Sequence, residues 1–138
     1  MSFCEKLVIP IEPVAAVRPK VTRWNTYYPG KYGKYLPELR EYLKVHWEKE
    51  APSDALLEVT AQFELRRPKS HYGTGRNSKV VKQSAARVPH QDVDNLAKGL
   101  MDALSGVAYG DDKQVVRLVA EKLFGEGRMV VEVREVCG

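Results

Sequence analysis

Cysteine and long apolar runs are scarce in this sequence, and each scarcity excludes a class of protein. Cys4 and Cys137 lie near the two ends of the 138 residues and fit no zinc-ligand spacing. We expect small apolar thiols in a reducing cytoplasm, with a disulfide only if the terminal segments are neighbours. No apolar run approaches the roughly 18–20 residues that span a bilayer. Charges also interrupt the first ten residues, so we expect neither a membrane partner nor a signal peptide.

Acidic residues are absent from two stretches, residues 13–37 and 65–91, and both stretches carry Lys and Arg. The first interleaves its cations with Trp24 and four tyrosines, a combination that grips phosphates and stacks exposed bases. In the alternative interpretation, the tyrosines only pack a loop against the core. The second stretch has the polar composition of a mobile loop. The candidate nucleic-acid contacts are Arg18, Lys20, Arg23, Lys69, Arg76, Lys79, Lys82 and Arg87.

Carboxylates gather instead in residues 92–112, where five aspartates accompany one cation, Lys98. Asp92 and Asp94 are two residues apart, so an extended backbone points both side chains to one face. Asp111 and Asp112 follow Gly110 in a turn, and a helix between the two pairs would bring them together. Three converging carboxylates suit Mg²⁺, with Mn²⁺ as the alternative.

Each aspartate also has a purely structural explanation. Asp94 or the adjacent Asn95 can cap a helix. Lys98 and Asp102 are four apart and can form a surface ion pair, and aspartates such as Asp111 favour turns. A cluster of unpaired like charges nevertheless costs stability, and a divalent cation removes that cost. The pattern therefore favours a metal site that acts on a polyanion held by the basic stretches.

The periodicities predict one α+β domain over residues 1–138, with a mixed or antiparallel sheet and helices mainly on one face. Residues 55–67 alternate as a half-buried strand with one polar face, and residues 125–127 would join the last two strands as a hairpin. That valine-rich hairpin is either core or a subunit interface. The expected strands are residues 3–11, 55–67, 114–124 and 128–136, the helices 36–50 and 95–105, and the long loops 12–35 and 68–91.

Residues 89–116 carry a dense set of motifs over about a fifth of the chain. The motifs are Asp92-Val93-Asp94-Asn95-Leu96-Ala97-Lys98, then Asp102-Ala103-Leu104, then Asp111-Asp112-Lys113-Gln114-Val115. This segment resembles the signature of RusA-type Holliday junction resolvases. One departure is Gln91, where many relatives have proline, which affects only the turn before the first aspartate.

The resemblance implies a homodimeric, Mg²⁺-dependent endodeoxyribonuclease that cuts four-way junctions and other branched DNA in recombination and repair. It implies a bacterial protein, or a phage or prophage protein acting in the host cytoplasm. It implies that Asp92, Asp94 and Asp112 are metal ligands and catalytic, and that Lys98 is an essential cation. Asp111 and Asp102 receive supporting roles, orienting Lys98 or a metal-bound water.

The mechanism expected from this set is attack by a metal-activated water on the phosphodiester, with Lys98 stabilising the developing charge. Two rival functions stay open. The first is a metal-dependent nuclease that acts on flaps or other branched DNA, because fold does not fix substrate. The second is a non-catalytic nucleic-acid-binding module, in which the aspartates are only caps and turns.

Overall fold

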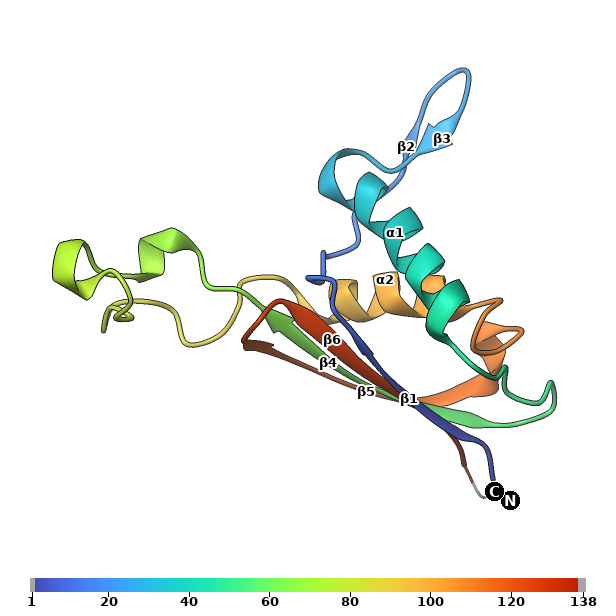
Figure 1. The fold of residues 1–138 in the computed structure, drawn as a ribbon. Coiled ribbons are helices and arrows are strands. Elements are labelled where there is room, and N and C mark those ends of the chain that lie inside the picture. The colour runs from blue at the N-terminus through green and yellow to red at the C-terminus, as the bar shows by residue number, and fades with distance from the viewer. Residues whose placement is uncertain (1, 137–138) are drawn as a thin grey trace.

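A four-stranded sheet with two helices on one face forms the body of the protein, described by a computed structural model over residues 2–136 (Figure 1). The sheet order is β1-β6-β4-β5, and only the β4–β5 pair is parallel. This mixed α+β arrangement confirms the predicted fold class. The elements are β1 (Cys4–Ile9), β2 (Lys20–Val21), β3 (Thr26–Tyr27), α1 (Gly30–His46), β4 (Leu57–Leu65), α2 (Val93–Leu104), β5 (Val115–Phe124) and β6 (Arg128–Glu135).

The predicted hairpin between the last two strands is wrong, because β4 lies between β5 and β6. The short connection crosses the end of β4, where the amide of Gly125 donates to the Leu65 carbonyl at 2.9 Å. Arg66 Nε donates to the Glu126 carbonyl at 3.0 Å and holds the same crossing. Gly127 has a φ of +79°, which only glycine adopts without strain. The connection therefore turns like a hairpin but leaves room for a strand inside it.

Strand β4 lies inside the sheet, between β6 and β5. Nearly all of it is buried, including two glutamates on the face away from the helices. Glu58 is 7% exposed and accepts a hydrogen bond from Arg134 Nε at 2.7 Å. This bond holds the pKa of Glu58 below its ordinary value, and the positive charges of Arg134 and Arg117 add to the effect. Glu64 is paired with Arg128 at 2.8 Å in the same way. Arginine side chains thus cover much of the face of β4 that the sequence predicts to be exposed to solvent.

Helix α1 begins at Gly30, six residues before the predicted start, and contains Pro37. Its buried stripe starts at Tyr32 and Tyr35 and continues through Leu39 and Leu43. For these two tyrosines, packing against the core is the correct interpretation. Gly30 and Pro37 mislead a local analysis because they ordinarily interrupt helices, whereas the buried stripe depends on the rest of the fold.

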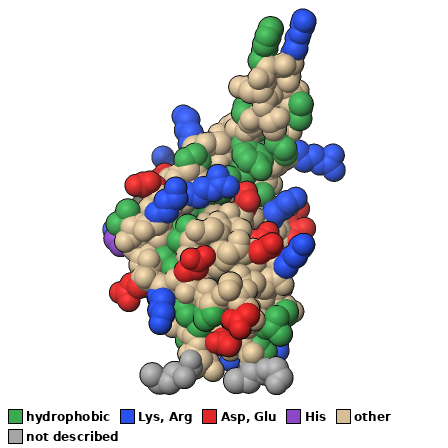
Figure 2. Space-filling model, turned by 90° about the vertical axis from the view of Figure 1, so that its right-hand side faces the viewer, with side chains coloured by type: hydrophobic (Ala, Val, Ile, Leu, Met, Phe, Trp, Pro, Cys, Tyr) green, Lys and Arg blue, Asp and Glu red, His purple; other side chains and the backbone are tan. Residues whose placement is uncertain are grey.

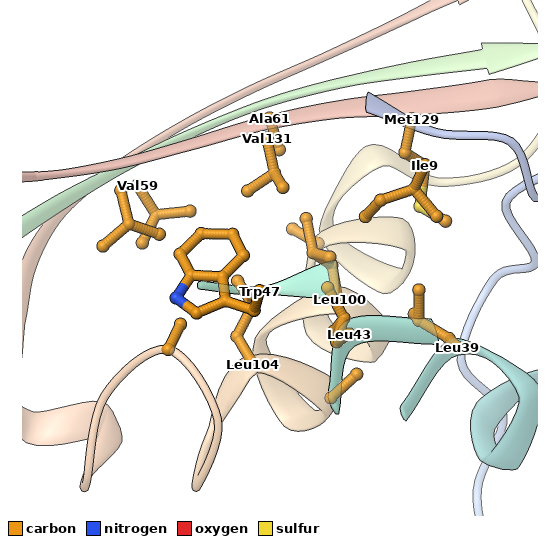
Figure 3. Close-up of a cluster of buried hydrophobic side chains, with 14 of the residues drawn as sticks. Ile9, Leu39, Leu43, Trp47, Val59, Ala61, Leu100, Leu104, Met129 and Val131 are labelled. Carbon is orange, nitrogen blue, oxygen red and sulfur yellow. The ribbon is translucent and has the colours of Figure 1, made fainter. Parts of the chain in front are cut away.

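The core fills the space between the two helices and the sheet (Figure 3). Leu39, Leu43 and Trp47 come from α1 and the residue after it, and Leu100 and Leu104 come from α2 (Figure 3). They meet sheet residues such as Val59, Met129 and Val131 (Figure 3). Each fully buried leucine of this kind contributes roughly 1.5–3 kcal/mol relative to exposure. Among the described residues, no helix is long and apolar enough to cross a membrane.

Candidate active site

Helix α2 presents its motif residues on the face opposite the core. Leu96, Leu100 and Leu104 are buried, whereas Asp94 and Lys98 are exposed. Residues four apart on a helix lie one above the other, so Asp94, Lys98 and Asp102 form one row. The helix is predicted correctly by its apolar period, and this row follows directly from it.

A cleft of about 620 Å³ runs between α2 and the segment that leads to the β2–β3 hairpin. The amide of Ala16 donates to the Asn95 carbonyl at 3.0 Å and fixes that segment on the helix. Lys98 and Arg18 contribute cations to the cleft wall, and Asp102 and Asp112 contribute carboxylates. The remaining lining residues are Ala16, Val17, Pro19, Tyr28, Tyr32, Asn95 and Met101. An anionic group can therefore meet two cations beside two carboxylates.

The adjacent aspartates Asp111 and Asp112 lie in different environments. Asp111 Oδ1 accepts from the Lys113 amide at 2.9 Å, and Gln114 Oε1 accepts from the Asp111 amide at 3.4 Å. This reciprocal capping box closes the 3₁₀ turn Asp112–Gln114. Gln114 Nε2 also donates to the Pro52 carbonyl at 2.8 Å, which ties the turn to the body. Asp112 is left at the cleft wall.

Asp102 has an ion-pair partner that the sequence does not predict. Its carboxylate lies 3.5 Å from Arg40 of α1, and both side chains are nearly half exposed. Exposed pairs of this kind contribute little to stability, but this one turns Asp102 toward α1. Within residues 2–136, neither Asp102 nor Asp111 forms a hydrogen bond or an ion pair with Lys98. Their supporting role toward Lys98 stays a prediction.

Asp92, and not Asp94 or Asn95, occupies the N-cap position of α2, and its side chain makes no capping hydrogen bond. Asp94 lies in the first turn of the helix. In the described part of the chain, the side chains of Asp92, Asp94, Lys98 and Asp112 have no hydrogen bond or ion pair. The structural explanations as caps or surface pairs thus do not apply to these four side chains.

The expected convergence of Asp92, Asp94 and Asp112 is not seen. Of the three, Asp112 alone lines the cleft. Within residues 2–136, no three His, Cys, Asp or Glu side chains form a group that could hold a metal ion. Carboxylates repel one another in the absence of a cation, so separation is the favoured arrangement of the bare side chains. The donor set still fits a hard divalent cation, because these carboxylates are exposed and not engaged elsewhere.

Two buried tyrosines near the cleft are not among the predicted site residues: Tyr32 lines it, and Tyr109 contacts the lining residue Met101. Tyr109 is fully buried, and its hydroxyl donates to the Met101 carbonyl at 3.3 Å. Burial raises its pKa, and the charges of Asp112 and Asp102 raise it further. Burial, then Asp102, also raises the pKa of Tyr32 to about 12. Both hydroxyls are neutral at pH 7, and of the two tyrosines Tyr32 forms part of the cleft lining.

Gly99 is the sequence signal that could have indicated the close packing of a side chain against α2. A Cβ at Gly99 would lie 3.2 Å from Tyr32 Cε1, closer than nine in ten real Cβ contacts. A glycine inside a helix costs about 1 kcal/mol relative to alanine, so it ordinarily marks a close approach. Here that approach lets the Tyr32 ring lie against α2 at the floor of the cleft.

Comparison with known proteins identifies the group to which this fold and motif belong. Residues 10–134 match the family described as Endodeoxyribonuclease RusA. The chain belongs to the RusA endodeoxyribonuclease family. It is also 30% identical to an uncharacterized protein, YqaN, of Bacillus subtilis strain 168, over 96% of this chain and 97% of that protein. Membership indicates nuclease activity on DNA.

In this RusA-family chain, the candidate DNA-binding residues lie on the cleft wall and on two projections from the body (Figure 1). Arg18 lines the cleft, whereas Lys20 and Arg23 belong to the β2–β3 hairpin. The other five, Lys69, Arg76, Lys79, Lys82 and Arg87, lie on an arm formed by residues 68–91. All eight are exposed. Figure 2 shows apolar and cationic side chains on the projecting part and acidic and basic side chains mixed below it.

The arm has local structure rather than being a featureless loop. It contains two 3₁₀ turns, Lys69–His71 and Gly75–Asn77, and an isolated bridge between Tyr72 and Val81. Arg67 holds its base by lying 4.1 Å over the Phe124 ring and donating to the Ala86 carbonyl at 2.8 Å. The predicted mobility of the arm stays a prediction.

Proposed function

We propose that this protein is a divalent-metal-dependent endonuclease that cuts branched DNA, with the four-way junction as its preferred substrate. One observation carries the proposal. Four motif side chains (Asp92, Asp94, Lys98 and Asp112) are exposed and, among residues 2–136, make no hydrogen bond or ion pair, whereas their neighbours Asp102 and Asp111 do. Side chains without such bonds are free to serve a ligand, and membership of a nuclease family supports a metal ion and a DNA phosphate as the ligands.

Asp92, Asp94 and Asp112 are the residues that would hold the metal ion, which we infer to be Mg²⁺, with Mn²⁺ as the alternative. When bound, the ion supplies positive charge to the scissile phosphate and lowers the pKa of a water molecule. Asp92 and Asp94 have no bond to break before they approach Asp112. Ligand binding is therefore expected to draw the three carboxylates together.

The protein's own groups then position and stabilise the phosphate. Lys98, in the middle of the α2 row, offsets negative charge that develops on the phosphoryl oxygens. Arg18 holds the DNA backbone from the opposite wall of the cleft. Tyr32 is protonated at neutral pH, as any tyrosine is, and its pKa is raised further, to about 12, so it offers a hydroxyl and not a base. No nucleophilic side chain is required for this reaction.

The substrate class follows from the two projections. The hairpin and the arm reach away from the body in different directions, which suits DNA that presents more than one duplex (Figure 1). A four-way junction has approximate two-fold symmetry and needs two nicks, so two identical subunits are the simplest enzyme for it. We place this activity in DNA recombination and repair in the cytoplasm of a bacterium, encoded by the host or by a phage.

The decisive experiment is cleavage of an end-labelled four-way junction with Mg²⁺ or with EDTA. Linear duplex, flap and single-stranded substrates serve as controls, and Asp94→Asn serves as the inactive protein. Paired, symmetric nicks that need Mg²⁺ and occur only in the junction are the expected result. Cleavage of flaps or single strands alone would support the proposed nuclease activity but show that the four-way junction is not its substrate.

A second candidate function, a non-catalytic DNA-binding module, is favoured by the exposed hairpin tip. Trp24 is 86% exposed there, and the Arg23 guanidinium lies 5.4 Å from its ring centre. An exposed arginine–tryptophan pair of this kind can stack on a nucleic-acid base. Tight junction binding without cleavage, across several divalent metals, would support this candidate and overturn the proposed enzyme.

A further inference from the structure

Asp102 is placed to pair with either of two cations. It follows Lys98 by four residues on α2, a spacing at which opposite charges pair along one face of a helix. Its carboxylate instead lies 3.5 Å from the Arg40 guanidinium of α1. Among residues 2–136, Lys98 forms no ion pair at all. A contact between the two helices thus takes the place of the contact within α2.

The three side chains differ in their relation to the cleft. Lys98 and Asp102 both line it, whereas Arg40 is not one of the residues of the described chain that form its wall. Arg40 therefore offsets the charge of a carboxylate in the cleft without itself occupying the space in which a ligand would lie. It has no direct part in the site that the sequence motifs predict.

Tyr32 connects this ion pair to the cleft. Burial raises the pKa of the Tyr32 hydroxyl most, the charge of Asp102 raises it further, and the charge of Arg40 lowers it. Both charges therefore act on a side chain of the cleft lining. Tyr32 also lies against Gly99, the residue after Lys98 and three before Asp102. The ion pair is thus beside the part of the cleft where Lys98 meets a ligand.

An unpaired carboxylate at this place would oppose the binding of a phosphate in two ways. It would compete with the phosphate for the Lys98 ammonium, because an ion pair four residues apart forms readily on a helix. It would also repel the phosphate directly, since like charges a few ångströms apart interact appreciably near a protein surface. A cation that engages the Asp102 carboxylate from outside the cleft removes both effects.

We propose that Arg40 is a positioning residue, which holds Asp102 toward α1 and so leaves the Lys98 ammonium available to a DNA phosphate. The inference deepens the proposed function and rests on it for the identity of the ligand. An arginine suits the task, because its guanidinium is charged at every physiological pH and binds carboxylates well. Asp102 then serves Lys98 by being kept away from it.

Competitive acetylation of lysine amines, read by mass spectrometry on the full chain, tests the pairing without DNA or metal. The exposed Lys6 is the internal reference. In Arg40→Ala, acetylation of Lys98 relative to Lys6 is expected to fall about twofold, because Asp102 is then free to pair with Lys98. The double variant Arg40→Ala/Asp102→Asn is expected to recover the original ratio. An unchanged ratio in Arg40→Ala would overturn the inference.

Binding of a labelled four-way junction in EDTA, followed by fluorescence anisotropy, tests the consequence for DNA. Arg40→Ala is expected to weaken binding about three- to tenfold at low salt. Adding Asp102→Asn is expected to restore most of the affinity, and Arg40→Lys should retain most of it because a cation remains. If Asp102→Asn gives no rescue, Arg40 contacts the phosphate itself and the positioning role is wrong.

Two controls separate this role from a general one. Lys44→Ala removes another exposed cation from α1, one turn further on, and should leave both readouts nearly unaltered. In a Lys98→Ala background, Arg40→Ala should lose most of its effect on DNA binding, and a full effect there would contradict the inference. Urea unfolding verifies that each variant is folded, as expected for an exposed ion pair. Because neither readout requires cleavage, an inactive protein that passes both would refute only the proposed nuclease.

Discussion

At the scale of single residues, the adjacent Asp111 and Asp112 have different roles, the first structural and the second, as we propose, functional. Asp111 caps its own turn, whereas Asp112 has no internal partner in residues 2–136. We expect Asp112→Asn to lower the rate of junction cleavage by about 100-fold or more, while the free energy of unfolding in urea stays unchanged. Asp92→Asn and Asp94→Asn should behave in the same way, because their side chains are equally unengaged.

The matched control is Asp111→Ala. It removes the capping carboxylate and should lower the free energy of unfolding by about 0.5–2 kcal/mol. It should leave much more activity than Asp112→Asn. A reversed pattern, with Asp112→Asn destabilised and Asp111→Ala inactive but stable, would exchange the roles of the two residues.

Lys98 is expected to act on the phosphate and not on the metal. Lys98→Ala should lose cleavage, again by about 100-fold, while Mn²⁺ binding followed by calorimetry stays intact, because the carboxylates remain. Lys44→Ala removes an exposed lysine from the last turn of α1 that does not line the cleft, and serves as the control. Near-normal cleavage by Lys98→Ala would remove this residue from the mechanism.

At the scale of elements, the parts that the sequence predicts well are those decided by local periodicity. Helix α2 follows from its apolar spacing, and its row of Asp94, Lys98 and Asp102 follows from the helix. Strand β4 follows from its alternation. The start of α1 does not, because the burial of Tyr32 that overrides Gly30 and Pro37 depends on distant residues.

Pairing between elements is harder to predict from the sequence. A three-residue connection favours a hairpin between β5 and β6, but β4 lies between them and its two edges pair with β5 and β6. The partner of Asp102 is on α1, and the cap made by Asp111 needs Gln114 anchored to Pro52. These are tertiary contacts, and no local pattern specifies them.

The β2–β3 hairpin is the element most clearly shaped for a partner. Its turn is held by Thr22, whose hydroxyl bonds Asn25, so Trp24 is presented by a fixed loop. We expect Trp24→Ala to weaken junction binding by about 5- to 150-fold, the loss of one base–aromatic stack of about 1–3 kcal/mol. Fluorescence anisotropy with a labelled junction measures it.

Trp24→Phe provides the control, since it keeps an aromatic face and should recover most of the affinity. Equal losses in the two variants would point to a role of the indole other than stacking. Unchanged binding in both would place the hairpin outside the DNA interface.

At the scale of the whole molecule, charge location and not net charge should control DNA affinity. The net charge is only +4, but the arm gathers cations at one end of the molecule (Figure 1). Each neutralised phosphate contact makes the decline of log affinity with log salt steeper by about 0.9. Changing Arg76, Lys79 and Lys82 to Gln should therefore reduce the slope by about 2–3 units.

A matched variant removes the same charge elsewhere. Lys6, Lys44 and Lys49 are also exposed. Lys44 is in the last turn of α1 and Lys49 follows the helix by three residues, and this end of α1 lies away from the arm (Figure 1). Their change to Gln should leave the slope nearly unaltered, because a uniform field is screened within about 8 Å at physiological ionic strength. Equal slopes in the two variants would show that the arm makes no phosphate contacts, and DNA would then have to bind through the cleft and hairpin alone.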